Sequence, residues 1–215
     1  MLQVLVLCDD YWHPGEVIEL GLARLSEEGF ALRFVHAAKD ILTPALLARY
    51  AVVINCKGNS VNAANRTPWF TDGAEVGPAE LTAYVENGGG FISLHAGNTP
   101  REGEPYAELV GSWFIGHPPR CPVAVRVTAQ HPVTAGVADF SVYDEHYAIE
   151  LVAEDAEVLL RTASETGGDQ VGGYVRTLGK GRLCALTPGH VLGVLENPEY
   201  QKLLANAIRW VAGVA

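Results

Sequence analysis

Short, mostly apolar runs recur along the chain and alternate with helical patterns. The five clearest runs span residues 2–7, 31–35, 51–54, 90–94 and 182–187. Runs of this kind are typical of strands that are buried on both faces of a sheet. The segments between them carry apolar residues at helical spacing, as does the closing pattern that follows Asn197 and Pro198. Strands and helices in this alternation predict a parallel sheet that is covered by helices.

The region after residue 120 has a different pattern. Three shorter strand-like segments follow one another there without a long helix between them, at 123–127, 157–160 and 172–177. We interpret this region as a small mixed-strand extension of the sheet. The sequence therefore predicts a doubly wound α/β fold in one domain over residues 1–215. Its central sheet is expected to be mainly parallel, with helices on both faces.

The balance of charges limits the partners that this chain can bind. Lys and Arg number 15 against 25 Asp and Glu, which gives a formal net charge of −10. Binding to nucleic acid or to an anionic membrane surface needs a basic face. The sequence also holds no run of 18 apolar residues that could form a membrane-spanning helix. We expect neither a nucleic-acid nor a membrane partner, whereas a neutral small molecule is compatible with this charge.

The cysteines and the first residues favour a cytoplasmic location. Cys8, Cys56, Cys121 and Cys184 are far apart and form no Cys-x-x-Cys pair, which excludes a zinc ribbon or a dithiol redox motif. Free thiols are typical of the reducing cytoplasm. The first residues lack the basic start and the long apolar segment of a signal peptide. The oligomeric state stays open, a homo-oligomer included.

Polar side chains follow the ends of four predicted strands. They are Trp12 and His13 after the first strand, Asn59 after the third, His95 and Asn98 after the fourth, and His190 after the last. In an open parallel sheet, ligands bind beyond the carboxyl ends of the strands. Three histidines at one edge therefore predict a functional site, although a single histidine after a strand is usually structural.

The fourth strand ends in a turn that has the pattern of a nucleophile elbow. Residues 88–97 read Gly-Gly-Gly-Phe-Ile-Ser-Leu-His-Ala-Gly, so that His95 stands at the apex of a tight turn of small residues. A strained turn of this shape pushes one side chain into the site. An imidazole there can ligate a metal, polarise a carbonyl or act as a base. The alternative is that His95 only fills the turn and bonds to the backbone.

Six motifs, taken in order, resemble the ThuA-like or trehalose-utilisation family. They are the run 88–95, Gly-Ser-Trp-Phe-Ile-Gly-His-Pro at 111–118, His-Pro-Val-Thr-Ala-Gly at 131–136, Asp-Glu-His-Tyr at 144–147, Gly-Lys-Gly-Arg at 179–182 with Gly-His at 189–190, and the closing helix that ends Ile-Arg-Trp at 208–210. The resemblance implies a flavodoxin-like fold of the class I glutamine amidotransferase type. It also implies a link to the metabolism of trehalose-type disaccharides and their keto-sugar intermediates.

The resemblance also implies which chemistry is missing. Amidotransferases of that fold carry a cysteine at the elbow and a histidine after a later strand, whereas here His95 occupies the elbow and His190 the later position. The four cysteines stand elsewhere, so the chain lacks the thiolate that would attack glutamine. We do not expect glutaminase activity.

The same motifs supply the predicted site. We expect His95, His190 and Glu145 to carry the chemistry. The residues expected to bind substrate are Trp12, His13, Asn59, Asn98, Trp113, His117, Asp144 and Tyr147. A divalent metal such as zinc is compatible with His95, His117, Glu145 and His190, because imidazoles and carboxylates are among its usual ligands.

Two functions fit this pattern. In the first, the protein is an isomerase, lyase or hydrolase of a sugar or keto-sugar derivative, and the histidines and the carboxylate move a proton beside a carbonyl. In the second, it is a non-catalytic module that binds a small molecule and keeps an amidotransferase-like shape. Convergence of His95, His117, Glu145 and His190 within metal-bonding reach would favour the enzyme.

Overall fold

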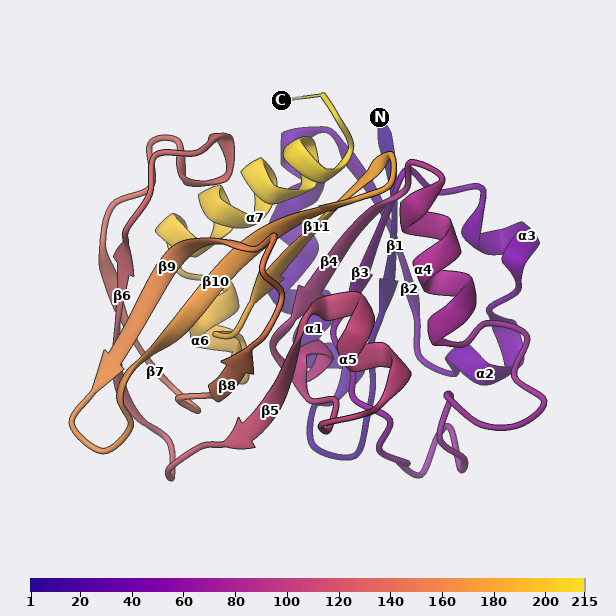
Figure 1. Ribbon diagram of the computed structural model, residues 1–215, viewed down its shortest axis with the longest axis horizontal. Coiled ribbons are helices and arrows are strands. Elements are labelled where there is room, and N and C mark those ends of the chain that lie inside the picture. The colour runs from indigo at the N-terminus through magenta and orange to yellow at the C-terminus, as the bar shows by residue number, and fades with distance from the viewer. Residues whose placement is uncertain (215) are drawn as a thin grey trace.

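Five parallel strands form the centre of the computed structural model, which describes residues 1–214 (Figure 1). They are β1 (Leu2–Leu7), β2 (Phe30–Val35), β3 (Val52–Asn55), β4 (Gly90–Leu94) and β11 (Gly181–Leu186). Their order across the sheet is β2-β1-β3-β4-β11, which is the strand order of a flavodoxin-like fold. The strands predicted from the apolar runs are confirmed. Ala215, the last residue of the predicted domain, lies outside the described residues.

Both faces of this parallel sheet are buried, which explains the continuous apolar runs. In β1, Val4 and Val6 pack into one core, while Leu5 and Leu7 pack into the other. The first core is covered by α1 (Gly15–Leu22), η1 (Ala23–Glu28), α6 (Leu192–Leu195) and α7 (Pro198–Val211). The second core is covered by α2 (Ala38–Ile41), α3 (Pro44–Leu47), α4 (Pro78–Glu86) and α5 (Pro105–Val110). Figure 1 shows α7, in yellow, and α4 on opposite sides of the strands.

The mixed-strand extension is present and is larger than the sequence predicts. Beyond β11, the sheet continues with four antiparallel strands, so that within residues 1–214 it has nine strands. In spatial order these are β10 (Gly168–Leu178), β9 (Glu157–Ser164), β6 (Cys121–Val127) and β7 (Phe140–Asp144). The extension joins the parallel strands directly, because β11 pairs with β4 on one side and with β10 on the other.

A second, two-stranded sheet lies beside the extension. It consists of β5 (Ser112–Gly116) and β8 (Ala148–Leu151), which pair antiparallel. The sequence pattern does not indicate these strands, because both are short and most of their side chains are half-buried. Two further turns are 3₁₀ helices, η2 (His95–Asn98) and η3 (Pro132–Thr134). None of the helices described in residues 1–214 has the length and apolar character needed to cross a membrane.

The start of α7 offers a direct test of the helix pattern read from the sequence. The Asn197 side chain accepts hydrogen bonds from the backbone N–H groups of Glu199 and Tyr200. Replacement of such a cap by alanine costs about 1 kcal/mol, and Asn197→Ala should therefore lower the melting temperature by about 2–4 °C in a chain of this size. Differential scanning calorimetry measures the shift. The exposed Asn87, changed to alanine in the same way, should shift the melting temperature by less than half as much.

Candidate functional site

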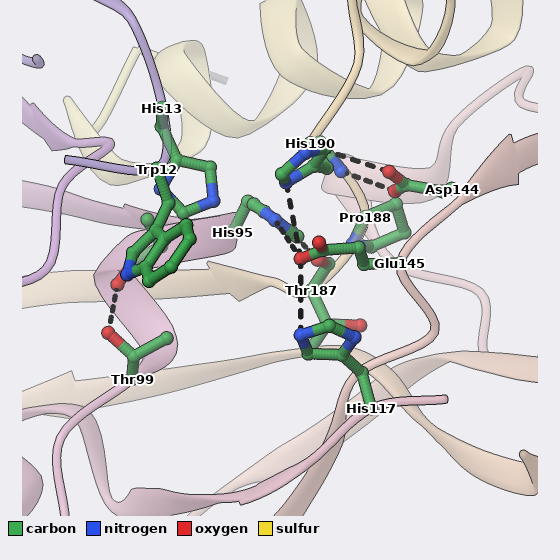
Figure 2. A network of polar contacts seen from close by, with 12 residues as sticks. Trp12, His13, His95, Thr99, His117, Asp144, Glu145, Thr187, Pro188 and His190 are labelled. Carbon is green, nitrogen blue, oxygen red and sulfur yellow. Dashed lines mark hydrogen bonds and ion pairs between the residues drawn. The ribbon is translucent and has the colours of Figure 1, made fainter. Parts of the chain in front are cut away.

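Three histidines meet where the parallel strands end. His13 follows β1, His95 follows β4 directly, and His190 follows β11 (Figure 2). The ring centroid of His13 lies 5.0 Å from that of His95 and 4.9 Å from that of His190. The order of the strands reverses between β1 and β3, and a reversal of this kind opens the crevice in which doubly wound sheets bind ligands.

The turn after β4 is strained and fixes the imidazole of His95. His95 has φ +44°, in the left-handed region, which costs a residue with a side chain about 1–3 kcal/mol. Its Nδ1 donates to the carbonyl of Thr187 at 2.8 Å, so Nε2 points toward Glu145. The helix that follows is only the four-residue η2. Gly189 lets the β11 turn close on this side chain, because a Cβ there would lie 3.1 Å from the Cβ of His95.

Asp10 orients His13 and holds its Nε2 free. The Nδ1 of His13 donates to Asp10 Oδ1 at 2.7 Å, and both residues are buried. Burial raises the pKa of Asp10, but its bonds from His13 and from the backbone outweigh this and lower it overall. Burial lowers the pKa of His13, and the facing rings of His95 and His190 lower it further against the effect of Asp10. Asp10 is therefore ionised near pH 7, and His13 is neutral, with a lone pair on Nε2 that is able to bind a metal.

Glu145 lies at the centre of the histidines, on the loop that follows β7. Its Oε2 lies 3.2 Å from Nδ1 of His190, 3.5 Å from Nε2 of His117 and 3.6 Å from Nε2 of His95 (Figure 2). Burial raises the pKa of Glu145, but the facing rings of His190, His95 and His117 outweigh this and hold it well below its usual range. Glu145 is therefore a carboxylate at neutral pH.

The chemistry and spacing of this cluster fit a divalent cation. One ligand atom from each of His13, His95, Glu145 and His190 lies within 4.8 Å of all the others. In tetrahedral zinc with bonds of about 2.0–2.1 Å, neighbouring ligand atoms are about 3.3 Å apart. The distances of 3.2 and 3.6 Å from Glu145 to His190 and His95 are close to that spacing. We refer to these four residues as the His/Glu cluster.

Three nitrogens of the cluster are buried without a hydrogen-bond partner. Nε2 of His13, Nε2 of His95 and Nδ1 of His190 have none among residues 1–214. A buried polar atom left unsatisfied costs about 1–3 kcal/mol, so three together call for a ligand. The second ring nitrogen of His13 and of His95 is held by a carboxylate and a carbonyl, which is the usual support for metal-ligating histidines.

His117 lies beside the cluster and outside its set of mutual distances. Its Nδ1 donates to the carbonyl of Pro118 at 2.8 Å, and its Nε2 faces Glu145. The side chain is one third exposed. Among the residues expected to ligate a metal, the structure thus brings His95, Glu145 and His190 together, adds His13, and places His117 on the open side.

A cavity of about 690 Å³ opens above the His/Glu cluster. Five of the residues expected to bind substrate line it: Trp12, His13, Asn59, His117 and Tyr147. Glu145, from the catalytic set, lines it as well. The lining also includes residues that the sequence pattern does not indicate, namely Lys57, Phe70, Arg101, Glu104, Tyr106 and Phe114. These stand in loops and short elements outside the recognised motifs, apart from Phe114.

The other three residues expected to bind substrate lie outside this lining. Trp113 is half-buried next to Phe114 on β5, and because side chains alternate along a strand, Phe114 takes the cavity side. Asn98 is fully buried and donates to the carbonyls of Ser93 and Leu186. Asp144 is also buried and accepts the backbone N–H groups of Gly189 and His190 at 2.8 and 3.0 Å. Asn98 and Asp144 thus hold the turns that carry the site.

None of the four cysteine thiols is placed to react with a ligand in this cavity. Cys8, Cys56 and Cys184 are buried, Cys121 is half-buried, and none of the four lines the cavity. Burial raises the pKa of the Cys8 and Cys184 thiols to about 12 and that of Cys56 well above its ordinary value. Thiols with such pKa values are uncharged and poor nucleophiles at neutral pH.

Comparison with known proteins adds a family and a fold. A family model described as ThuA, trehalose utilisation, matches residues 3–211. No curated protein matches the sequence. A solved ThuA-like protein from Bacteroides uniformis is similar over 98% of this chain and 91% of its own, with 22% identity and a TM-score of 0.75.

Two further solved structures are similar over nearly their whole length. A cytoplasmic protein from Salmonella typhimurium has 13% identity and a TM-score of 0.71, with 98% of this chain and 99% of that chain covered. A glutamine amidotransferase from Thermotoga maritima has 13% identity and a TM-score of 0.64, with 98% of each chain covered. At this identity the likeness shows the fold, which is the amidotransferase-like α/β fold expected from the sequence.

The buried carboxylate of Asp144 gives a test of how the site is held. Asp144→Asn keeps the size of the side chain but turns an amide N–H₂ toward one of the two backbone donors, so one buried N–H loses its acceptor. The free energy of unfolding should fall by about 1–3 kcal/mol, as measured by urea denaturation. Asp139 also accepts a backbone N–H, from Val127, but at an exposed position. A loss in Asp139→Asn equal to that in Asp144→Asn would contradict the role given to Asp144.

Proposed function

We propose that this chain, which belongs to the ThuA family, acts on a sugar or keto-sugar derivative at a His/carboxylate centre that binds a divalent cation such as zinc. One observation carries the proposal: three buried ring nitrogens without a hydrogen-bond partner belong to the His/Glu cluster, whose ligand atoms lie within 4.8 Å of one another beside a cavity, and two of these nitrogens face the carboxylate of Glu145. A location in the cytoplasm accords with the description of the similar Salmonella protein.

The hydrogen bonds of the histidines favour a cation over a simple cluster of ion pairs. The carbonyls of Thr187 and Pro118 accept from Nδ1 of His95 and of His117. In a neutral imidazole this leaves a lone pair on Nε2, so both lone pairs face the negative charge of Glu145. A cation among these atoms converts the repulsion into coordination. Without it, several imidazolium rings would have to be buried around one carboxylate, which is costly.

The cavity suits a polyhydroxylated, carbonyl-bearing ligand. Its walls combine the aromatic rings of Trp12, Phe70 and Phe114 with polar groups such as Asn59 and Thr99, the mixture of apolar surface and a few polar groups that small-molecule sites present. A divalent cation at the His/Glu cluster would polarise a carbonyl oxygen. This supports an isomerase, lyase or hydrolase of a sugar. Glutaminase chemistry is not proposed, because the elbow carries His95 and no thiol lines the cavity.

Zinc binding tests the proposal first. The protein, stripped with EDTA and dialysed, should bind one equivalent of zinc in isothermal titration calorimetry. His95→Ala and His13→Ala should each weaken binding by at least about 100-fold, and Asp10→Asn by about 10–100-fold, the range for loss of a supporting partner. Zinc should also raise the melting temperature of the wild type, because it binds only the folded state.

The matched control is His36→Ala. His36 is half-exposed, pairs with Glu19 and does not line the cavity. The zinc affinity of the His36→Ala variant should therefore equal that of the wild type. The metal part of the proposal fails if the wild type binds no zinc, or if His36→Ala weakens binding as much as His95→Ala does.

Two tryptophans test where the ligand lies. Trp12 lines the cavity and is 66% exposed, whereas Trp113 does not line it. Trp12→Ala should weaken the binding of a keto-disaccharide by about ten-fold, because an aromatic contact contributes about 0.5–1.5 kcal/mol beyond its buried area. Saturation-transfer NMR titrations measure the affinity. Trp113→Ala should leave it unchanged, and an equal loss in both variants would place the ligand elsewhere.

A further inference from the structure

His117 differs from the other histidines of the site in its access to the cavity. It lines the cavity and is one third exposed. His13 also lines the cavity but is buried, and His95 and His190 are not among the lining residues. Its Nδ1 hydrogen is held by the Pro118 carbonyl, so the free Nε2 is the atom that faces inward. Figure 2 shows His117 approaching Glu145 from the side opposite His190. A ligand above the cluster would therefore meet this Nε2.

Tyr147 holds the ring of His117 in place. The Tyr147 ring packs against two imidazoles: its centroid lies 4.1 Å from that of His95 and 5.5 Å from that of His117, and it is nearly parallel to both. Burial raises the pKa of the Tyr147 phenol, so the ring remains uncharged. The side chain is buried, yet it also forms part of the cavity wall. The stack gives His117 a fixed distance from the cluster.

We propose that His117 is the catalytic base of this site and removes a proton from the carbon next to the carbonyl of an α-hydroxy ketone or aldehyde. The proposal rests on the proposed function, since it needs a carbonyl ligand at the cation-binding cluster. A base must lie within hydrogen-bond reach of the proton that it takes. Nε2 of His117 lies 3.5 Å from Glu145 Oε2, so it borders the volume in which a ligand of the cluster would lie.

The step balances within the substrate and this one side chain. Nε2 of His117 accepts the proton, and the electron pair of the broken C–H bond forms a C=C bond. The π pair of the carbonyl moves to its oxygen, which gives an enediolate whose charge lies beside the cation site. The proton of the neighbouring hydroxyl moves to the enolate oxygen. Return of the abstracted proton from His117 to the former carbonyl carbon then exchanges the positions of the carbonyl and the alcohol. Because the His117 side chain is one third exposed, the proton that it takes up is able to exchange with solvent before it returns.

The test follows hydrogen–deuterium exchange at carbon. Dihydroxyacetone is incubated in D₂O with zinc-loaded protein, and loss of its CH₂ signal is followed by ¹H NMR. The wild type should accelerate exchange over the protein-free solution. His117→Gln should reduce this acceleration by about 100-fold or more, the contribution of a general base, while calorimetry shows an unchanged zinc stoichiometry. His36→Gln, the same substitution outside the cavity, should exchange at the wild-type rate.

The outcomes separate this inference from the proposed function. If His117→Gln binds zinc and exchanges at the wild-type rate, the role of His117 is wrong and the metal site stands. If the zinc-loaded wild type causes no exchange, proton abstraction by His117 is overturned, again with the metal site intact. If the wild type binds no zinc, the proposed function itself fails. If His117→Gln loses zinc, His117 is a ligand and not the base.

Discussion

Parallel strands end at the same edge of a sheet, and this constraint brings the site together. His13, His95 and His190 are far apart in the sequence, but each follows a strand of the parallel half, and the three rings meet within about 5 Å. The fold alone would not hold them at that distance, because three imidazoles with free lone pairs gain nothing from one another. Glu145 adds a carboxylate to these lone pairs, so the set as a whole suits a cation, and it follows a strand of the antiparallel half of the sheet.

The arrangement has a conformational cost, and the surrounding structure bears it. Asp9 and His95, which stand at the ends of β1 and β4, both have φ in the left-handed region, at +76° and +44°. Such residues persist only where packing and hydrogen bonds over-determine them. Asn62 and Asn65 donate to the Asp9 carbonyl, and Thr187 accepts from His95. Backbone strain at these two strand ends thus lies in the turns that lead to His13 and carry His95.

The sequence predicted the parallel half well because burial on both faces leaves a strong pattern. It predicted the histidines at the strand ends for the same reason, since their positions follow from the strands. The pattern failed for β5 and β8, whose side chains are mostly half-buried. The pattern also did not show that Phe114, and not Trp113, lines the cavity. Which side chains of a short strand face inward depends on how the strand pairs with its partner.

The roles of individual polar residues were harder to predict than their positions. Asp144 and Glu145 are adjacent in the sequence, yet one caps the turn of His190 and the other faces the cluster. The motif does not distinguish them. Adjacent side chains point in different directions, but the sequence does not show which of the two faces the site. Nε2 of His13 is a candidate ligand because the other ring nitrogen, Nδ1, is bonded to Asp10. The Asp-x-x-His spacing alone does not predict this bond, since it depends on the shape of the turn between the two residues.

The direct junction of the two halves at β11 makes the site sensitive to partial opening. Proteins open in cooperative units whose free energies differ, and the least stable unit opens most often. If the antiparallel strands opened while the parallel core stayed folded, Glu145 and the Asp144 cap would leave together. The histidines would remain on an intact core without their carboxylate. The fraction of molecules with a complete site is then governed by the stability of the extension, even when the core as a whole remains far from unfolding.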